Sequence, residues 1–249
     1  ELLNVAAEKM QEAGYAHRLA LSPDGQRLAW TTEFEHRLRV WDRATNKMRE
    51  LPKPNHSPSR LLFAPDGKSL ASAVGNKVHF FDAANGEELG SADGKVYGFG
   101  GEMTFTPDGR TLVLAGVEWE PGTEAKRALP VVSMVDVKTR QVTKKHTGKT
   151  STSTGTKHTG KTSTPSGYRL SSSRDATQWV LSYTPEGNVV VWDLVTGKEE
   201  VVVRDKTPCW AAISPDGRTL AIVPEQSDDK NKKVLSLWRR GGKREPSER

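Results

Sequence analysis

The sequence lacks any run of about eighteen apolar residues, the length that a helix needs to cross a membrane. Its first residues also lack the basic region and the apolar region that together make a secretory signal. We therefore expect neither a membrane span nor a signal peptide, and the cytoplasm is favoured only by default. A first residue that is Glu rather than Met also fits a processed or excised part of a longer protein.

Cysteine is nearly absent, since Cys209 is the single one in the chain. One cysteine excludes an intramolecular disulfide framework and a cysteine-rich metal site. His146 and His158 have no carboxylate or cysteine close by, so we expect exposed side chains there and no metal. No set of Ser, His and Asp stands out either. We expect no cofactor and no enzymatic activity.

Acidic residues are missing or few in two short stretches, which explains the net charge of +6. Residues 144–167 hold five lysines and no acid, and the tail from Arg239 holds five basic residues against two glutamates. These stretches carry more than the whole net charge, so the remainder is slightly acidic and has no basic stripe. Nucleic-acid binding by the folded part is therefore not expected.

What the sequence does contain is an internal repeat. Four segments are copies of one unit with a Pro-Asp-Gly centre, and a fifth is a degenerate copy: residues 19–29, 61–71, 103–113, 211–221 and, degenerate, 170–180. The equivalent positions Pro23, Pro65, Pro107, Arg174 and Pro215 are spaced by 42, 42, 67 and 41 residues. One step is therefore about 25 residues longer than the others, which indicates an insertion in a regular array.

Each unit predicts four short strands. Alternating apolar residues such as Leu19 and Leu21 have the period of two that buries one face of a strand. The Pro-Asp-Gly centre then predicts a tight turn, because Pro presets φ, Asp bonds its own backbone and Gly accepts a positive φ. A third apolar stretch, such as residues 38–42, and a fourth after a polar turn complete the unit. The fold class is therefore all-β, built from antiparallel four-stranded sheets.

These residues resemble the WD-repeat family. Trp41-Asp42 and Trp192-Asp193 are literal Trp-Asp pairs, and a Ser-Pro-Asp-Gly hairpin upstream with a Thr-Gly turn downstream belongs to the same signature. The resemblance implies a β-propeller of four-stranded antiparallel blades with five repeat units over residues 1–240 and a polar tail at 241–249. The Gly-His pair that the family has ahead of each first strand is missing, so we expect blades held mainly by apolar packing.

Two ways of completing the ring stay open. The last unit stops after its third strand, and residues 2–5 follow Glu1 as a fourth strand would, so the N-terminal strand is one candidate for closing a monomeric ring. The alternative is that the chain is an arc of a larger ring. The sequence does not distinguish them.

The long step between units three and four is predicted to be a disordered, low-complexity insertion at 144–167. It contains a duplicated His-Thr-Gly-Lys-Thr-Ser-Thr stretch. Within it, residues 155–162 match the phosphate-loop pattern G-x-x-x-x-G-K-[ST]. The match lacks the apolar strand before it and the helix after it that bind phosphate, so we expect no nucleotide site.

In this family the starts of the first strands and the loops between second and third strands share one face, where binding takes place. Aromatic residues and arginine, which are typical of interfaces, gather at those positions. The candidate partner-binding residues are Arg18, Phe34, His36, Arg60, Tyr97, Trp119, Arg169 and Trp210. We expect a scaffold for protein–protein interaction, free-standing or as the sensing or regulatory module of a larger protein. The alternative is a propeller enzyme or small-molecule binder that uses the central channel.

Overall fold

The computed structural model of the chain is built from β-strands and turns, and the residues that it describes contain no helix. The described residues are 16–32, 37–52, 58–94, 97–119, 127–148, 152–153, 168–183, 188–204, 209–224 and 235–239. Within them there is no helix with the length and apolarity that crossing a membrane requires. Their strand pairings are antiparallel, as the period-two pattern with tight turns predicts.

The first repeat unit forms one sheet, which we name sheet A. Its strands lie side by side in chain order: β1 (Ala16–Leu21), β2 (Arg27–Thr32), β3 (Leu38–Asp42) and β4 (Lys47–Glu50). The predicted turn joins β1 to β2, where the Gly25 amide donates to the Ser22 carbonyl at 2.9 Å. Gly25 has a φ of 68°, a left-handed conformation that favours glycine. The Pro-Asp-Gly centre therefore acts as the sequence predicts.

The other four repeat units give sheets B, C, D and E. Sheet B contains β5 (Arg60–Phe63), β6 (Ser69–Val74), β7 (Lys77–Asp82) and β8 (Glu88–Asp93). Sheet C contains β9 (Tyr97–Phe105), β10 (Thr111–Trp119), β11 (Arg127–Asp136), β12 (Val142–Thr147) and the short β13 (Thr152–Ser153). Sheet D contains β14 (Tyr168–Ser172), β15 (Gln178–Tyr183), β16 (Asn188–Asp193) and β17 (Lys198–Arg204). Sheet E contains β18 (Cys209–Ile213), β19 (Thr219–Pro224) and β20 (Ser236–Arg239).

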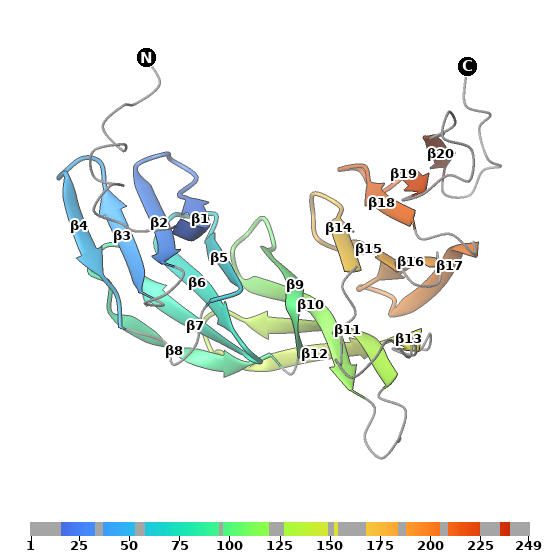
Figure 1. Cartoon of the computed structure of the whole chain (residues 1–249), viewed down its shortest axis with the longest axis horizontal. Coiled ribbons are helices and arrows are strands. Elements are labelled where there is room, and N and C mark those ends of the chain that lie inside the picture. The colour runs from blue at the N-terminus through green and yellow to red at the C-terminus, as the bar shows by residue number, and fades with distance from the viewer. Residues whose placement is uncertain are drawn as a thin grey trace, which may run out of the picture.

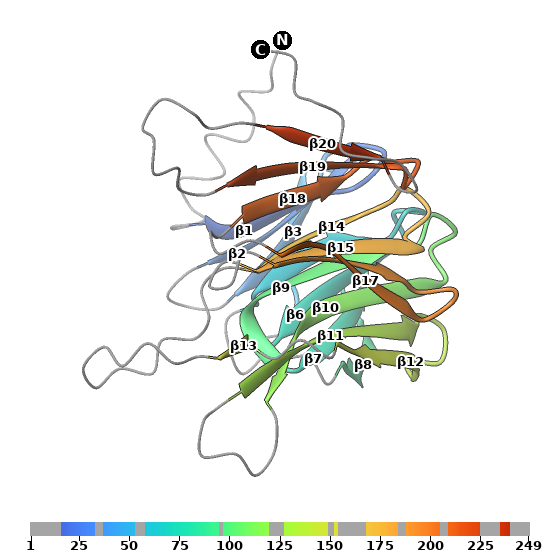
Figure 2. The ribbon, with the colours of Figure 1, turned by 90° about the vertical axis from the view of Figure 1, so that its right-hand side faces the viewer.

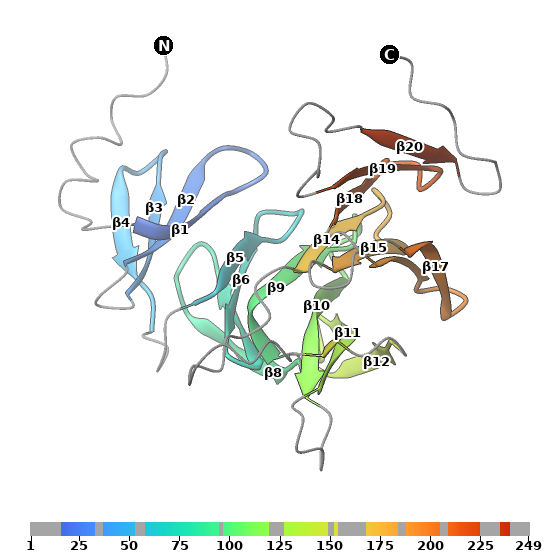
Figure 3. The ribbon, with the colours of Figure 1, turned by 45° about the vertical axis from the view of Figure 1, so that its right-hand side comes forward.

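The five sheets follow one another along an arc, with sheet A and sheet E at its two ends (Figures 1 and 3). The first strands lie on the inner side of the arc and the fourth strands on its outer side. Each first strand contacts the first strand of the next sheet, in the order β1, β5, β9, β14 and β18. Seen from the side, sheets E, D and C lie one above another, and sheets A and B lie behind them (Figure 2).

Apolar side chains fill the junction between each pair of successive sheets. At the junction of sheets A and B, Leu38 and Val40 pack with Leu61 and Phe63, and all four are buried. Similar clusters lie between B and C, between C and D, and between D and E. A sheet inside the arc is therefore apolar on both faces, as expected for repeats that bury their surface only by stacking.

Sheet E has three strands among the described residues, as its sequence predicts. The N-terminal strand that is predicted to complete it, residues 2–5, lies outside the described residues. The tail at 241–249 also lies outside them.

The predicted start of the insertion at Lys144 is wrong. Strand β12 runs to Thr147, and its polar residues pair with β11 as far as Val131. Strand β13 also lies inside the predicted insertion and pairs with β11. The ten-residue β11 offers backbone partners to neighbours that have no apolar pattern of their own, which is why composition alone misplaces this boundary. The remainder of 149–167 lies outside the described residues.

Candidate binding rim

The repeats place one position of every first strand at the same distance from its hairpin. This position lies five residues before the proline position of the turn, and its residues are Arg18, Arg60, Glu102, Arg169 and Trp210. In the structure they lie in β1, β5, β9, β14 and β18. Because successive first strands contact one another, these five positions follow one edge of the arc. We call this edge, with Ser59, the rim.

Polar contacts along the rim connect three successive sheets. The Nε of Arg18 in sheet A donates to the Ser59 carbonyl at 2.7 Å. Arg60 in sheet B donates to the same carbonyl through Nη1 at 3.2 Å and pairs through Nη2 with Glu102 Oε1 of sheet C at 3.1 Å. The side chains of Arg60 and Glu102 are 28% and 31% exposed. Ion pairs near the surface contribute about 0.2–1 kcal/mol, so this pair fixes side-chain positions more than it stabilises the fold.

A small cavity opens at the rim between sheets B and C. Ser59, Asn76 and Lys77 line it from sheet B, and Glu102 and Leu114 line it from sheet C. Its volume is about 30 Å³, enough for about one water molecule. Pockets for small organic ligands measure roughly 300–1,000 Å³. This part of the rim therefore presents a surface of polar groups and not a ligand-sized pocket.

The structure brings part of the predicted site together. Arg18 and Arg60 meet at one carbonyl, and Trp210 is 37% exposed on sheet E. The strand positions of Tyr97, Trp119 and Arg169 are described by their pairing with Val117, Ala128 and Ser182. Phe34 and His36 lie outside the described residues.

Sequence reasoning missed Glu102 and Ser59. It selected residues by type, and neither Glu nor Ser belongs to the types enriched at interfaces. The signal for Glu102 was present, because the repeat alignment puts it in the same column as Arg18 and Arg60. Ser59 acts through its backbone carbonyl, which no side-chain pattern reveals.

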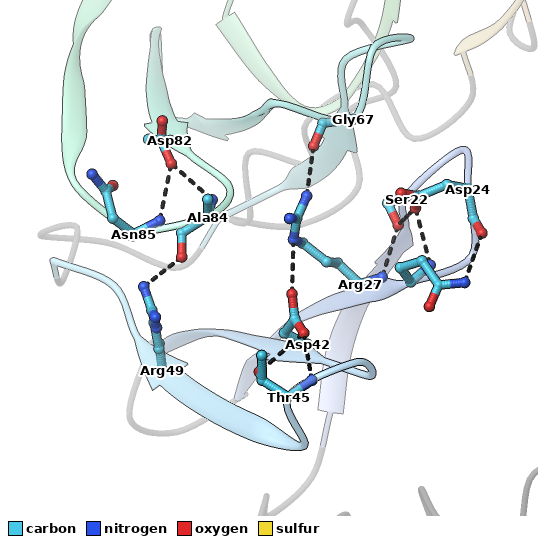
Figure 4. Close-up of polar contacts among 11 residues, drawn as sticks. Ser22, Asp24, Arg27, Asp42, Thr45, Arg49, Gly67, Asp82, Ala84 and Asn85 are labelled. Carbon is cyan, nitrogen blue, oxygen red and sulfur yellow. Dashed lines mark hydrogen bonds and ion pairs between the residues drawn. The ribbon is translucent and has the colours of Figure 1, made fainter.

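The opposite edge of the arc carries the hairpins, and its carboxylates have structural roles (Figure 4). Arg27 donates to Asp42 of its own sheet at 3.2 Å and to the Gly67 carbonyl of the next sheet at 3.3 Å. Arg49 also reaches across, to the Ala84 carbonyl. Hydrogen bonds therefore join successive sheets at this edge, as they do at the rim.

The recurring aspartates accept hydrogen bonds within their own turns. A hydrogen bond from the Ser22 hydroxyl, helped by the Gln26 amide, holds the pKa of Asp24 below its usual value. Asp108, Asp175 and Asp216 have lowered pKa values for the same reason, with Thr106, Ser173 and Ser214 as first donors. The amides of Thr45 and Thr139 lower the pKa of Asp42 and Asp136.

These aspartates are therefore turn residues, as the sequence predicts. Among the described residues no three His, Cys, Asp or Glu side chains gather into a group that could hold a metal ion.

Comparison with known proteins identifies no family for the chain. No family model and no curated protein matches it. Solved structures do match, and one is hydrazine synthase from Kuenenia stuttgartiensis, with 19% identity and a TM-score of 0.57 over 83% of this chain. The match spans 61% of the length of the hydrazine synthase chain. In all, 1055 solved chains match, so the architecture is widespread, and at 19% identity the likeness shows the fold alone.

Proposed function

We propose that the five sheets are blades of a WD-repeat β-propeller, and that this propeller is a scaffold that binds another protein through the rim. The repeat of one strand–turn–strand unit, the chain order of the strands in each sheet and the stacking of sheets along an arc support the propeller. The literal Trp-Asp pairs of sheets A and D support the family.

The observation that carries the binding role is the chain of contacts from Arg18 through Ser59 and Arg60 to Glu102. It holds charged groups from three sheets in fixed positions at one edge, so a partner meets them already ordered. Trp210 adds a large, partly exposed aromatic surface at the end of the same edge. Arginine and tryptophan are among the residue types that dominate binding energy at protein interfaces.

The experiment is affinity capture from a lysate of the source cell with three forms of the chain. The test form carries Arg60→Ala and Trp210→Ala, both in the rim. The matched control carries Arg110→Ala, which removes an arginine on the opposite edge whose side chain is 85% exposed. Circular dichroism confirms that all three forms are folded.

We expect one protein to be retained by the parent and by the Arg110 control and lost with the rim variant. Truncating an interface hot spot costs about 2 kcal/mol, which weakens binding roughly 30-fold for each residue. Equal retention by the rim variant would show that the rim is not the binding surface. The alternative of a small molecule or an enzyme in the channel stays a prediction from the sequence.

A further inference from the structure

The rim carries a positive charge, although the chain outside its two stretches rich in lysine and arginine is slightly acidic as a whole. Among the five equivalent positions three residues are arginines and one is a glutamate, so their net charge is +2: Arg18, Arg60, Arg169 and Glu102. The first strands that carry them follow one another on the inner side of the arc (Figures 1 and 3). Such an edge attracts anionic groups.

Two guanidinium groups of the rim meet at one backbone oxygen. The Nε of Arg18 in sheet A and the Nη1 of Arg60 in sheet B both donate to the Ser59 carbonyl, at 2.7 Å and 3.2 Å. The two guanidinium groups therefore lie close together, although like charges repel. A carbonyl oxygen carries only a partial negative charge. A full negative charge at this point would attract groups from two sheets at once.

Glu102 of sheet C supplies one such charge, and its contact with Arg60 is a limited one. Glu102 Oε1 accepts from Arg60 Nη2 at 3.1 Å, and both side chains are partly exposed. This pair uses one oxygen and one nitrogen, whereas a carboxylate binds a guanidinium most strongly through two parallel hydrogen bonds. Glu102 therefore shows that a carboxylate fits beside Arg60, and a carboxylate from another molecule can make the stronger, two-bond contact.

The acids next to this pair already face bases. Lys77 is exposed and lines the same small cavity as Glu102. Asp93 lies opposite Lys77 in the pairing of β7 with β8 and accepts a hydrogen bond from Asn76 at 3.4 Å. A partner that covers this part of the rim removes water from its basic groups, which is costly unless the partner brings negative charge. A basic or neutral segment brings none.

The rim fits an acidic protein segment better than a nucleic acid. A nucleic acid carries a phosphate at every nucleotide and needs a continuous basic surface. Glu102 interrupts the arginines of the rim, and Trp210 ends the row with a partly exposed aromatic ring. A protein segment can present a few carboxylates to the arginines and an apolar side chain to the ring.

We propose that the partner presents an acidic segment to the rim, and that a carboxylate of this segment pairs with Arg60 in place of Glu102. The inference rests on the proposed function, because it names the kind of protein segment that the rim binds. Glu102 holds Arg60 in position while the rim is empty, and it competes with the carboxylate of the partner.

The test measures binding of a fluorescein-labelled oligo-glutamate peptide to the full chain by fluorescence anisotropy. Two variants, Arg60→Gln and Glu102→Gln, break the same ion pair and introduce the same amide. If the pair served only the structure of the rim, both would change binding in the same direction. The matched controls Arg110→Gln and Glu87→Gln make the same changes of charge at exposed positions on the opposite edge. Circular dichroism checks that every form is folded.

We expect the parent to bind oligo-glutamate with an affinity that falls as salt is added. Arg60→Gln weakens binding about tenfold, because the peptide loses its main cationic contact. Glu102→Gln strengthens binding by up to about fivefold, because the competing carboxylate is gone. Both controls keep an affinity close to that of the parent. Opposite effects of the two rim variants are the result that supports the proposal.

Three results overturn the proposal: no binding of oligo-glutamate to the parent, weaker binding in Glu102→Gln, or tighter binding of a labelled single-stranded oligonucleotide than of the peptide. The capture experiment above keeps the two claims apart. A protein that is captured through the rim while oligo-glutamate does not bind supports the proposed function and overturns the acidic segment. Oligo-glutamate binding with the two opposite effects, but with no captured protein, supports the acidic segment and leaves the scaffold without support.

Discussion

Gly148 lies at the end of β12, where two rings leave no room for a side chain. A Cβ there would be 2.7 Å from Pro130 Cγ and 2.7 Å from Trp192 Cζ2. Trp192 is the tryptophan of a literal Trp-Asp pair, and it is buried at the junction of sheets C and D. The tryptophan of the motif therefore packs against the preceding sheet, and Gly148 is the residue that lets it come close.

We expect Gly148→Ala to lower the free energy of unfolding by roughly 1–3 kcal/mol, the usual cost of adding atoms to a packed core. The measurement is urea unfolding followed by circular dichroism. The same substitution in a Trp192→Phe background serves as the control, because Phe lacks the Cζ2 atom that the new methyl group would meet. The cost should be smaller there. An equal cost in both backgrounds would mean that Trp192 does not limit the space.

The environment of Gly148 could not be predicted from the sequence. This glycine belongs to the His-Thr-Gly-Lys repeat, whose polar composition indicates a loop. Its contact with Trp192 joins residues 44 positions apart, and no local pattern reports such a contact. The aspartates are the opposite case. Asp24 and Asp108 bond to groups two residues away, so the short motif alone predicts their role.

At the scale of elements, strand β12 meets the turn between β16 and β17. Lys144 Nζ donates to the Leu194 carbonyl at 2.6 Å, and the His146 ring lies beside Gly197 of the same turn. His146 is therefore not the exposed loop residue that the sequence predicts. Its Nε2 is buried without a hydrogen-bond partner among the described residues. Burial, with the charge of Lys144, lowers the pKa of His146 below its ordinary 6.5.

This pKa gives the junction a dependence on pH. The folded chain binds a proton at His146 less readily than the unfolded chain does. The contribution of neutral His146 to the free energy of unfolding is therefore fully present above the ordinary pKa of 6.5, and it is lost as the pH falls through the pKa of the folded state. We expect the urea concentration at the unfolding midpoint to be lower at about pH 5.5 than at about pH 7.5. The decrease should be smaller in His146→Gln, because the glutamine side chain does not titrate. An identical fall in both forms would assign the effect to other groups.

Whether a strand could be predicted depends on where its pairing partner lies in the sequence. The hairpins within each unit form between neighbouring segments, so alternation and turn residues were enough to predict β1 to β4. The extension of β12 and the existence of β13 depend on the length of β11, which supplies backbone partners to polar segments. The residue types in those polar segments do not indicate that they pair with β11.

At the scale of the whole molecule, the described strands form a row of sheets in which each sheet contacts the next. Among the described residues, sheets B, C and D each contribute to two apolar clusters, whereas sheets A and E each contribute to one. In such arrays stability is close to a sum of the contributions of the repeats and of the junctions between them. A sheet with one junction therefore opens more readily than a sheet with two.

Hydrogen exchange read by mass spectrometry tests this distribution. In dilute solution we expect the amides of β2 and β19, in the terminal sheets, to exchange faster than those of β10, which lies in sheet C with a neighbour on either side. Equal exchange rates in all five sheets would instead mean that the arc opens as one cooperative unit. Its stability would then not be a sum of the contributions of separate repeats and junctions.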